Sequence, residues 1–141
     1  IFVATPGKGV YRSLDGGEFW GDDINEGLKQ YGGAFAVRDI LFLSASKEWL
    51  LLSTQYGLIK SLNLGANWEA LTLLTPPGGA QIQAVTIDPK DPQKIFYATN
   101  STFYQTTDGG QKWNTKKLPT TRTPTSLKNV SDQFRCNVYG C

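Results

Sequence analysis

Histidine and methionine are absent from this chain of 141 residues, and cysteine occurs only twice. Without histidine, Ser-His-Asp and Cys-His mechanisms are excluded, and so are histidine-based metal sites. Cys136 and Cys141 form a single C-x4-C pair, which cannot build a tetrahedral zinc site unaided. A local disulfide and two free thiols are equal alternatives for this pair. The sequence therefore predicts no metal and no cofactor.

Long apolar segments are also missing. The sequence contains no run of about 18 apolar residues and no basic, apolar leader, so it holds neither a transmembrane helix nor a signal peptide. Because the chain begins at Ile1 and carries no methionine, we expect these residues to be part of a longer product.

Neither sign of charge predominates, since 14 basic and 12 acidic residues leave a net charge of only +2. That value does not indicate nucleic-acid binding, although one segment is basic. Its cations are Lys112, Lys116, Lys117, Arg122, Lys128 and Arg135. Charge runs usually lie on solvated surface, and we prefer this interpretation to the alternative, a docking patch for an acidic partner. The N-x-S/T triplets at Asn100 and Asn129 are glycosylation acceptors only in a secreted eukaryotic protein.

One short pattern, S/T-x-D/N-x-G-x-x-W, occurs three times. We call the copies box 1 (residues 13–20), box 2 (residues 61–68) and box 3 (residues 106–113). The residues that define the pattern are Ser13, Asp15, Gly17 and Trp20, then Ser61, Asn63, Gly65 and Trp68, then Thr106, Asp108, Gly110 and Trp113.

The chemistry of these positions predicts a tight turn. A short Asp or Asn side chain accepts hydrogen bonds from nearby backbone N–H groups, and glycine tolerates a positive φ. The hydroxyl at the first position ties the two ends of the turn together, and the tryptophan folds back as an apolar plug. We expect the boxes to be structural turns, against the alternative of ligand or metal loops.

The spacing of the boxes defines an internal repeat. Box 2 begins 48 residues after box 1, and box 3 begins 45 residues after box 2. A period of this length predicts a solenoid or a propeller. Short runs rich in β-branched and aromatic residues separate the boxes, and they predict four strands in each complete repeat. For the third repeat these are Ala84 to Ile87, Ile95 to Ala98, Thr102 to Thr106 and Lys112 to Lys117.

The repeats divide the chain into a partial propeller and a tail. Residues 1–28 form a first blade without its innermost strand, because residues 1–4 align with residues 49–52, the second strand of the next blade. Residues 29–75 and 76–120 form two complete blades, residues 121–127 begin a further strand, and residues 128–141 are an atypical tail. The predicted fold is all-β, with about three four-stranded blades of an incomplete propeller.

The box pattern resembles the Asp-box, or BNR repeat, of β-propellers. The resemblance implies that the boxes lie on the rim, away from the central channel. Asp-boxes also occur in families that resemble sialidases and xyloglucanases, which would imply a glycosidase. A sialidase-like site would need an arginine cluster, a tyrosine nucleophile and an F/Y-R-I-P motif, none of which can be placed here. The only arginines are Arg12, Arg38, Arg122 and Arg135.

Carboxylates are the remaining candidates for catalysis, because a glycosidase mechanism requires a pair of them. Asp39 is the one acidic residue inside a predicted innermost strand, and its preferred interpretation is a polar strand residue bonded to backbone or to Arg38. Asp22, Asp23 and Glu26 form an acidic loop that we expect to face solvent. No residue is assigned a catalytic role.

The period, the I-D-P-K-D-P turn and the segment G-V-Y-R-S-L-D-G-G-E-F-W look most like photosystem II stability/assembly factors and their non-photosynthetic bacterial relatives. The resemblance covers residues 1–127 and implies a non-catalytic scaffold that docks a protein partner on the extracytoplasmic side of a membrane, to which a leader outside this sequence would attach it. No nucleic acid is expected. The alternative is a fragment of a secreted, carbohydrate-binding glycoside hydrolase. Because three blades do not close a propeller, we also expect self-association or further blades.

Overall fold

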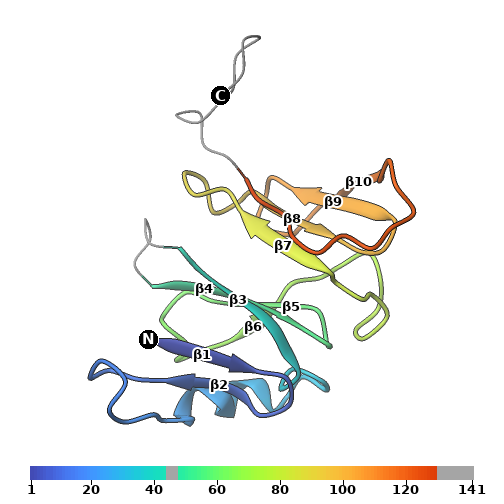
Figure 1. The fold of residues 1–141 in the computed structure, drawn as a ribbon. Coiled ribbons are helices and arrows are strands. Elements are labelled where there is room, and N and C mark those ends of the chain that lie inside the picture. The colour runs from blue at the N-terminus through green and yellow to red at the C-terminus, as the bar shows by residue number, and fades with distance from the viewer. Residues whose placement is uncertain (44–47, 130–141) are drawn as a thin grey trace. The chain divides into compact units, whose positions relative to one another are not determined.

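The computed structural model of the chain describes residues 1–43 and 48–129. By its internal contacts the chain divides into two compact units, Ile1–Ile82 and Gln83–Cys141. Figure 1 shows that both units are built from short strands, and every paired strand runs antiparallel to its neighbour. Among the described residues the only helix is one short 3-10 segment in the first unit.

The first unit begins with a two-stranded sheet. β1 (Phe2–Thr5) pairs with β2 (Gly9–Arg12), and a single bridge joins Arg12 to Gly21 beyond box 1. The 3-10 helix η1 (Asp23–Leu28) follows and buries Ile24, Asn25 and Leu28. The Asn25 side chain fixes η1 to the sheet, because its Oδ1 accepts the N–H of Val10 at 2.8 Å.

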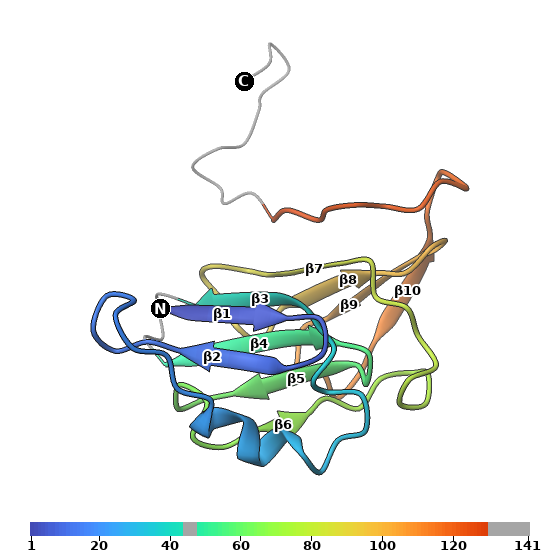
Figure 2. The ribbon, with the colours of Figure 1, turned by 60° about the horizontal axis from the view of Figure 1, so that its bottom comes forward.

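The second sheet of this unit has four strands in chain order, side by side in Figure 2. They are β3 (Val37–Leu43), β4 (Trp49–Thr54), β5 (Leu58–Ser61) and β6 (Glu69–Ala70). The near-continuous apolar run of β4 indicates a strand covered on both faces, and Leu50, Leu51 and Leu52 are all buried.

The core of the first unit lies between its two sheets. Leu50, Leu52 and Ile59 of the second sheet meet Val10 of the first sheet, and Phe2 and Ala4 pack against this cluster. Burying several aliphatic side chains stabilises the pair of sheets by roughly 1.5 to 3 kcal/mol for each one that is fully removed from water.

The second unit contains one four-stranded sheet, again in chain order. Its strands are β7 (Ala84–Ile87), β8 (Ile95–Ala98), β9 (Thr102–Thr106) and β10 (Asn114–Lys117). Aromatic pairs contact each other across β8 and β9: the ring centroids of Tyr97 and Tyr104 stack 4.4 Å apart, and those of Phe96 and Phe103 lie 6.0 Å apart.

The predicted all-β class is confirmed, with sheets of two, four and four strands. The strands predicted for the third repeat occur where expected, except that the last one begins at Asn114 instead of Lys112. Residues 121–127, expected to begin a further strand, pair with no strand among the described residues. Most of the expected tail, with Arg135, Cys136 and Cys141, lies outside the described residues.

The alignment of the first blade needs a correction of one residue. Ile1 and Ser13 exchange two backbone hydrogen bonds of 2.9 and 2.8 Å, whereas the equivalent Ser61 pairs with Leu50. Ile1 therefore corresponds to Leu50, and residues 1–4 match residues 50–53 instead of 49–52.

The physical reason is the length of the turn between the two strands. Three residues separate the paired Thr5 and Gly9, whereas two separate Thr54 and Gly57, which are joined by a backbone hydrogen bond of 2.9 Å. A shift of one residue moves every side chain of a strand to the other face. Phe2 and Ala4, and not Ile1 and Val3, consequently face the core.

Candidate functional site

Each box forms a turn that its own side chains close. In box 1 the Asp15 carboxylate accepts the N–H groups of Glu18 and Phe19 at 3.1 and 3.0 Å, and the Ser13 hydroxyl donates to the same oxygen at 2.8 Å. Ser13 Oγ in turn accepts the N–H of Gly17 at 2.8 Å. Two short side chains therefore satisfy three backbone donors that the turn would leave unpaired.

Boxes 2 and 3 repeat this arrangement. Ser61 and Thr106 donate to Asn63 and Asp108 at 3.0 and 2.7 Å. Their hydroxyl oxygens also accept the N–H groups of the box glycines, at 2.8 Å for Gly65 and at 3.0 Å in box 3. The amide oxygen of Asn63 accepts the N–H of Asn67 at 2.9 Å, whereas the N–H of Ala66 bonds to the backbone carbonyl of Asn63 at 3.2 Å.

A second left-handed position lies before each box glycine, and the sequence pattern did not reveal it. Gly16 and Gly109 have φ values of 77° and 73°, and Leu64 stands at the same place with a φ of 56°. Leucine rarely adopts this conformation, so box 2 carries backbone strain that the other boxes avoid. The consecutive glycines of boxes 1 and 3, Gly16-Gly17 and Gly109-Gly110, could have indicated two adjacent left-handed positions.

The turns favour the ionised form of their aspartates. The N–H of Phe19 and the hydroxyl of Ser13 hold the pKa of Asp15 below its usual range. In box 3 the N–H of Lys112 and the hydroxyl of Thr106 lower the pKa of Asp108 in the same way.

The three box tryptophans have different surroundings. Trp68 is 6% exposed and donates from Nε1 to the carbonyl of Ile24 at 2.7 Å. Box 2 is therefore packed against η1 through this tryptophan. Trp113 meets the ring of Tyr97 edge-on at 5.0 Å within the second unit. Trp20 is 42% exposed, and its Nε1 turns back to the carbonyl of Gly17 at 3.0 Å.

Trp20 belongs to an apolar surface on the first sheet that we call the outer face, made of Ile1, Val3, Tyr11 and Trp20. The equivalent residues of the second sheet are Leu50, Leu52, Ile59 and Trp68. All four equivalents are buried by the first sheet and η1, whereas Ile1 is 61% and Val3 44% exposed. One pattern of side chains therefore forms a core in one sheet and a surface in the other.

Ring stacking buries Tyr97 in the second unit. Its side chain is inaccessible to solvent, and among the described residues its hydroxyl has no hydrogen-bond partner. This burial raises the pKa of Tyr97 far above its usual value, because the phenolate form would be left without solvation.

The carboxylates and arginines considered for catalysis do not gather in one place in the first unit. Asp39 lies on β3 next to a bulge, is exposed, and accepts the N–H of Ile40 at 2.8 Å. Arg38 beside it is exposed. Arg12 forms an ion pair of 2.7 Å with Asp23, which also accounts for one carboxylate of the predicted acidic loop.

The remaining acidic-loop residues face solvent. Asp22 precedes η1 and is exposed, and Glu26 pairs with Lys29 one turn later. In the basic segment, Lys112, Lys116, Lys117 and Arg122 are exposed on or near β10.

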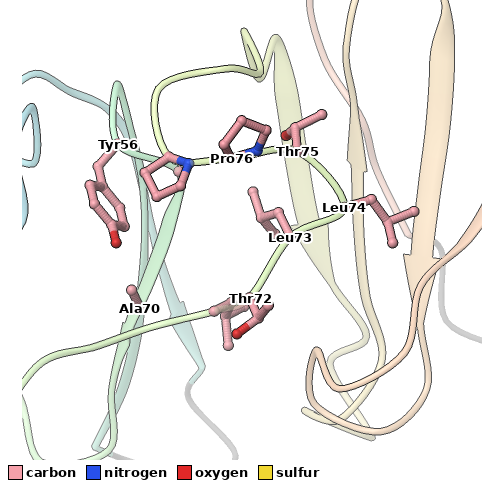
Figure 3. Close-up of a pocket in the computed structure, with 10 residues that line it drawn as sticks. Tyr56, Ala70, Thr72, Leu73, Leu74, Thr75 and Pro76 are labelled. Carbon is pink, nitrogen blue, oxygen red and sulfur yellow. The ribbon is translucent and has the colours of Figure 1, made fainter.

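A hollow of about 380 Å³ lies beside the segment that follows β6. Tyr56, Gly57 and residues 70–77 line it, and Figure 3 shows Tyr56 and Leu73 bordering it while Leu74 points away. The Thr75 hydroxyl is buried and has no hydrogen-bond partner among the described residues. The lining mixes two prolines, leucines and hydroxyls and contains no charged side chain.

Within residues 1–43 and 48–129, no group of three or more His, Cys, Asp or Glu side chains is placed to hold a metal ion. In the same ranges, no helix has the length and apolar character needed to cross a membrane.

Comparisons with known proteins support the fold. Neither a protein-family model nor a curated protein matches the sequence. The crystal structure of an ancestral GH74 enzyme aligns with 83% of this chain at a TM-score of 0.60 and 17% identity. The structure of YCF48 bound to a D1 peptide aligns with 68% of it at a TM-score of 0.53 and 21% identity.

At these identities the likeness shows the fold alone. The three antiparallel sheets are those of an incomplete β-propeller. The chain spans 16% of the length of the GH74 enzyme and 32% of that of YCF48.

Proposed function

We propose that this chain is a non-catalytic β-propeller module that docks a protein partner, in the manner of an assembly or stability factor. The outer face carries this proposal. Its four side chains are the counterparts of a protein core, yet Ile1, Val3 and Trp20 stand in solvent. Exposed apolar clusters of this kind mark surfaces that bind protein, and the occupant here is either a partner or a further blade.

The box residues are structural in this proposal. Their polar atoms are occupied by hydrogen bonds inside each turn, as for Asp15 with Ser13 and two backbone N–H groups. Peptide binding also occurs in one protein of similar structure, since YCF48 was solved bound to a D1 peptide. We place the module on the extracytoplasmic side of a membrane, as the resemblance of the repeats implies.

Selection of a displayed random-peptide library against the immobilised chain tests the proposal. We expect enriched peptides with apolar residues, and a dissociation constant from fluorescence anisotropy that rises at least about tenfold in Val3→Asp, because a carboxylate would be buried against an apolar ligand. Leu74→Asp is the matched control, since Leu74 is 59% exposed and outside the outer face. The proposal fails if no peptide is enriched or if both variants bind alike.

A glycoside hydrolase is the second candidate, and Asp39 is the observation that favours it. The residue stands exposed beside a bulge of β3, and bulges often re-aim side chains next to active sites. A glycosidase needs a second carboxylate at about 5 to 9.5 Å. Release of reducing ends from xyloglucan by the chain, abolished in Asp39→Asn, would establish this function in place of the first.

A further inference from the structure

Box 3 contains an aspartate directly before a glycine, Asp108 and Gly109, and box 1 has the equivalent pair Asp15 and Gly16. Aspartate in this dipeptide is prone to isomerise, because the backbone nitrogen of the next residue can attack its Cγ. Glycine has no Cβ that would hinder the ring closure, and its backbone is the most adaptable of all residues. The chemistry of this pair therefore makes box 3 a candidate site of covalent modification.

The reaction starts from the carboxylic acid form of Asp108. A bond forms between the Gly109 nitrogen and Cγ, the nitrogen loses its proton, and the carboxyl hydroxyl leaves, so that one water molecule is released. Water then opens the resulting cyclic imide at the former backbone carbonyl of Asp108. The main chain now passes through Cβ and Cγ, and the residue has become an isoaspartate without a change of mass.

The geometry of the turn favours this labile dipeptide. The first position must be a short acceptor of backbone N–H groups, which Asp108 is. The next position is left-handed, since Gly109 has a φ of 73°, and a Cβ there would collide with Oε1 of Gln93. Aspartate followed by glycine thus meets both local requirements of box 3.

The closed turn keeps the carboxyl group of Asp108 unreactive. One of its oxygens, Oδ1, accepts the N–H groups of Lys112 and Gln111 at 2.9 and 3.0 Å and the hydroxyl of Thr106 at 2.7 Å. The Lys112 N–H, followed by the Thr106 hydroxyl, lowers the pKa of Asp108. The ionised carboxylate has no hydroxyl that can leave as water, so it does not close the ring.

The closed turn also restrains the attacking nitrogen. The N–H of Gly109 donates to the backbone carbonyl of Gln93 at 3.0 Å. To attack, this nitrogen must release its proton and turn its lone pair toward Cγ, and the hydrogen bond opposes both changes. Asp108 itself is only half-buried, so water reaches the pair as soon as the turn opens.

Box 2 has the same restraint without the labile pair. There Asn63 is followed by Leu64, whose N–H donates to the carbonyl of Glu48 at 2.9 Å. The side chain of Leu64 hinders ring closure, at the cost of a φ of 56° that leucine rarely adopts. The dipeptide that isomerises readily is therefore confined to boxes 1 and 3.

We propose that Asp108 is a site of isoaspartate formation which the closed turn of box 3 protects, and which water converts when the turn opens. In the product the free carboxylate is attached to Cα, so Thr106, Gln111 and Lys112 lose the acceptor that closed the turn. The modified chain presents an isoaspartyl residue, the substrate class of protein isoaspartyl methyltransferases. This proposal goes beyond the docking function and does not depend on it.

Incubation of the 141-residue chain in water enriched in oxygen-18 tests the proposal, because opening of the imide places one heavy oxygen atom in the peptide that carries Asp108. Peptide mapping by mass spectrometry measures this uptake, and chromatography separates the isoaspartyl peptide. We expect conversion of Asp108 in the folded chain to be at least about tenfold slower than in urea, since it requires local opening. Equal rates in the folded and the unfolded chain would overturn the proposal.

A variant of box 3 tests the role of its hydrogen bonds. Thr106→Val removes the hydroxyl that donates to Asp108 and accepts the N–H of Gly110. It should raise the rate of conversion in the folded chain about fivefold, the effect of losing roughly one hydrogen bond. Thr115→Val makes the same change at an exposed position of β10 and should leave the rate unaltered. Near-ultraviolet circular dichroism of both variants confirms that the fold is retained.

Hydrogen exchange in the parent chain gives a test that needs no variant. The Gly109 amide exchanges only when its bond to Gln93 opens, so its exchange and the conversion of Asp108 should accelerate in parallel as urea is added below the unfolding transition. Two results would contradict the proposal. One is equal conversion in Thr106→Val and Thr115→Val, and the other is a Gly109 amide that stays protected while Asp108 converts as fast as in the unfolded chain.

Discussion

Boxes 1 and 2 contain the same turn in two different surroundings. Ser13 Oγ and Ser61 Oγ each accept the N–H of the box glycine at 2.8 Å, and both tryptophans follow three residues after that glycine. Yet Trp68 is packed against η1 and Trp20 is 42% exposed. The turn is thus a local property of eight residues, whereas the stabilisation that its tryptophan provides depends on the neighbouring segment.

The tryptophans give the largest expected difference between the boxes. Trp68→Ala should lower the free energy of unfolding by roughly 3 to 5 kcal/mol, because it empties a packed site and removes a hydrogen bond to Ile24. Trp20→Ala should cost much less, since much of that ring is already in water. Urea unfolding of both variants measures the comparison, and equal losses would show that burial of Trp68 contributes nothing beyond the turn.

The box glycines give the next largest difference. Gly65 and Gly17 have φ values of 90° and 102°, so alanine at either position costs about 1 to 2 kcal/mol of backbone strain. A Cβ at Gly65 would also lie 3.1 Å from the Cβ of Ile24, whereas at Gly17 the nearest atom is 3.8 Å away on Trp20. Gly65→Ala should therefore lose roughly 1 to 3 kcal/mol more than Gly17→Ala in thermal or urea unfolding.

If the two alanine variants were equally stable, η1 would have to move aside at no cost. Hydrogen exchange at the Val10 amide, which donates to Asn25 of η1 at 2.8 Å, reports such a movement directly.

The stability that boxes 1 and 3 provide should decrease in acid, whereas that of box 2 should not, because only boxes 1 and 3 contain an aspartate. The folded-state pKa values of Asp15 and Asp108 lie below those of the unfolded chain, so their contribution is present above the ordinary pKa of about 4 and is lost as the pH falls through the lower folded-state values. Asn63 does not titrate. Unfolding measured between about pH 5 and pH 2 should show a decline that is shallower in the double variant Asp15→Asn and Asp108→Asn.

The variant is suited to this test because the amide oxygen of Asn63 accepts the Ser61 hydroxyl and the N–H of Asn67, so an asparagine can close the turn without a charge. An unchanged acid profile would assign the decline to other carboxylates.

The smallest expected difference concerns the ion pairs of two equivalent cations, Arg12 and Lys60. Arg12 and Asp23 lie 2.7 Å apart, whereas Lys60 and Glu69, which stand opposite each other on β5 and β6, lie 3.9 Å apart. Both acidic partners are largely exposed, so each pair contributes at most about 1 kcal/mol. Arg12→Ala should cost slightly more than Lys60→Ala in low salt, and the difference should vanish in about 1 M salt, where charges are screened.

The sequence by itself determined what is local. The period of the boxes predicted the sheets, because strands and turns of a few residues depend on side-chain alternation and on glycine or Asp and Asn at set places. The same logic located β7, β8 and β9 to the residue. The absence of an inner strand from the first blade stays a prediction, and among the described strands only β2 is hydrogen-bonded to β1.

Tertiary structure alone decided the register of β1 and whether each box tryptophan is buried or exposed. One additional residue in the turn before Gly9 reverses the faces of β1, and a pattern of apolar residues cannot reveal this when both faces are apolar. Trp20 and Trp68 occupy the same position in the repeat, so no sequence pattern separates them. Their exposure differs because burial is a property of what lies opposite a side chain, and η1 lies opposite only one of them.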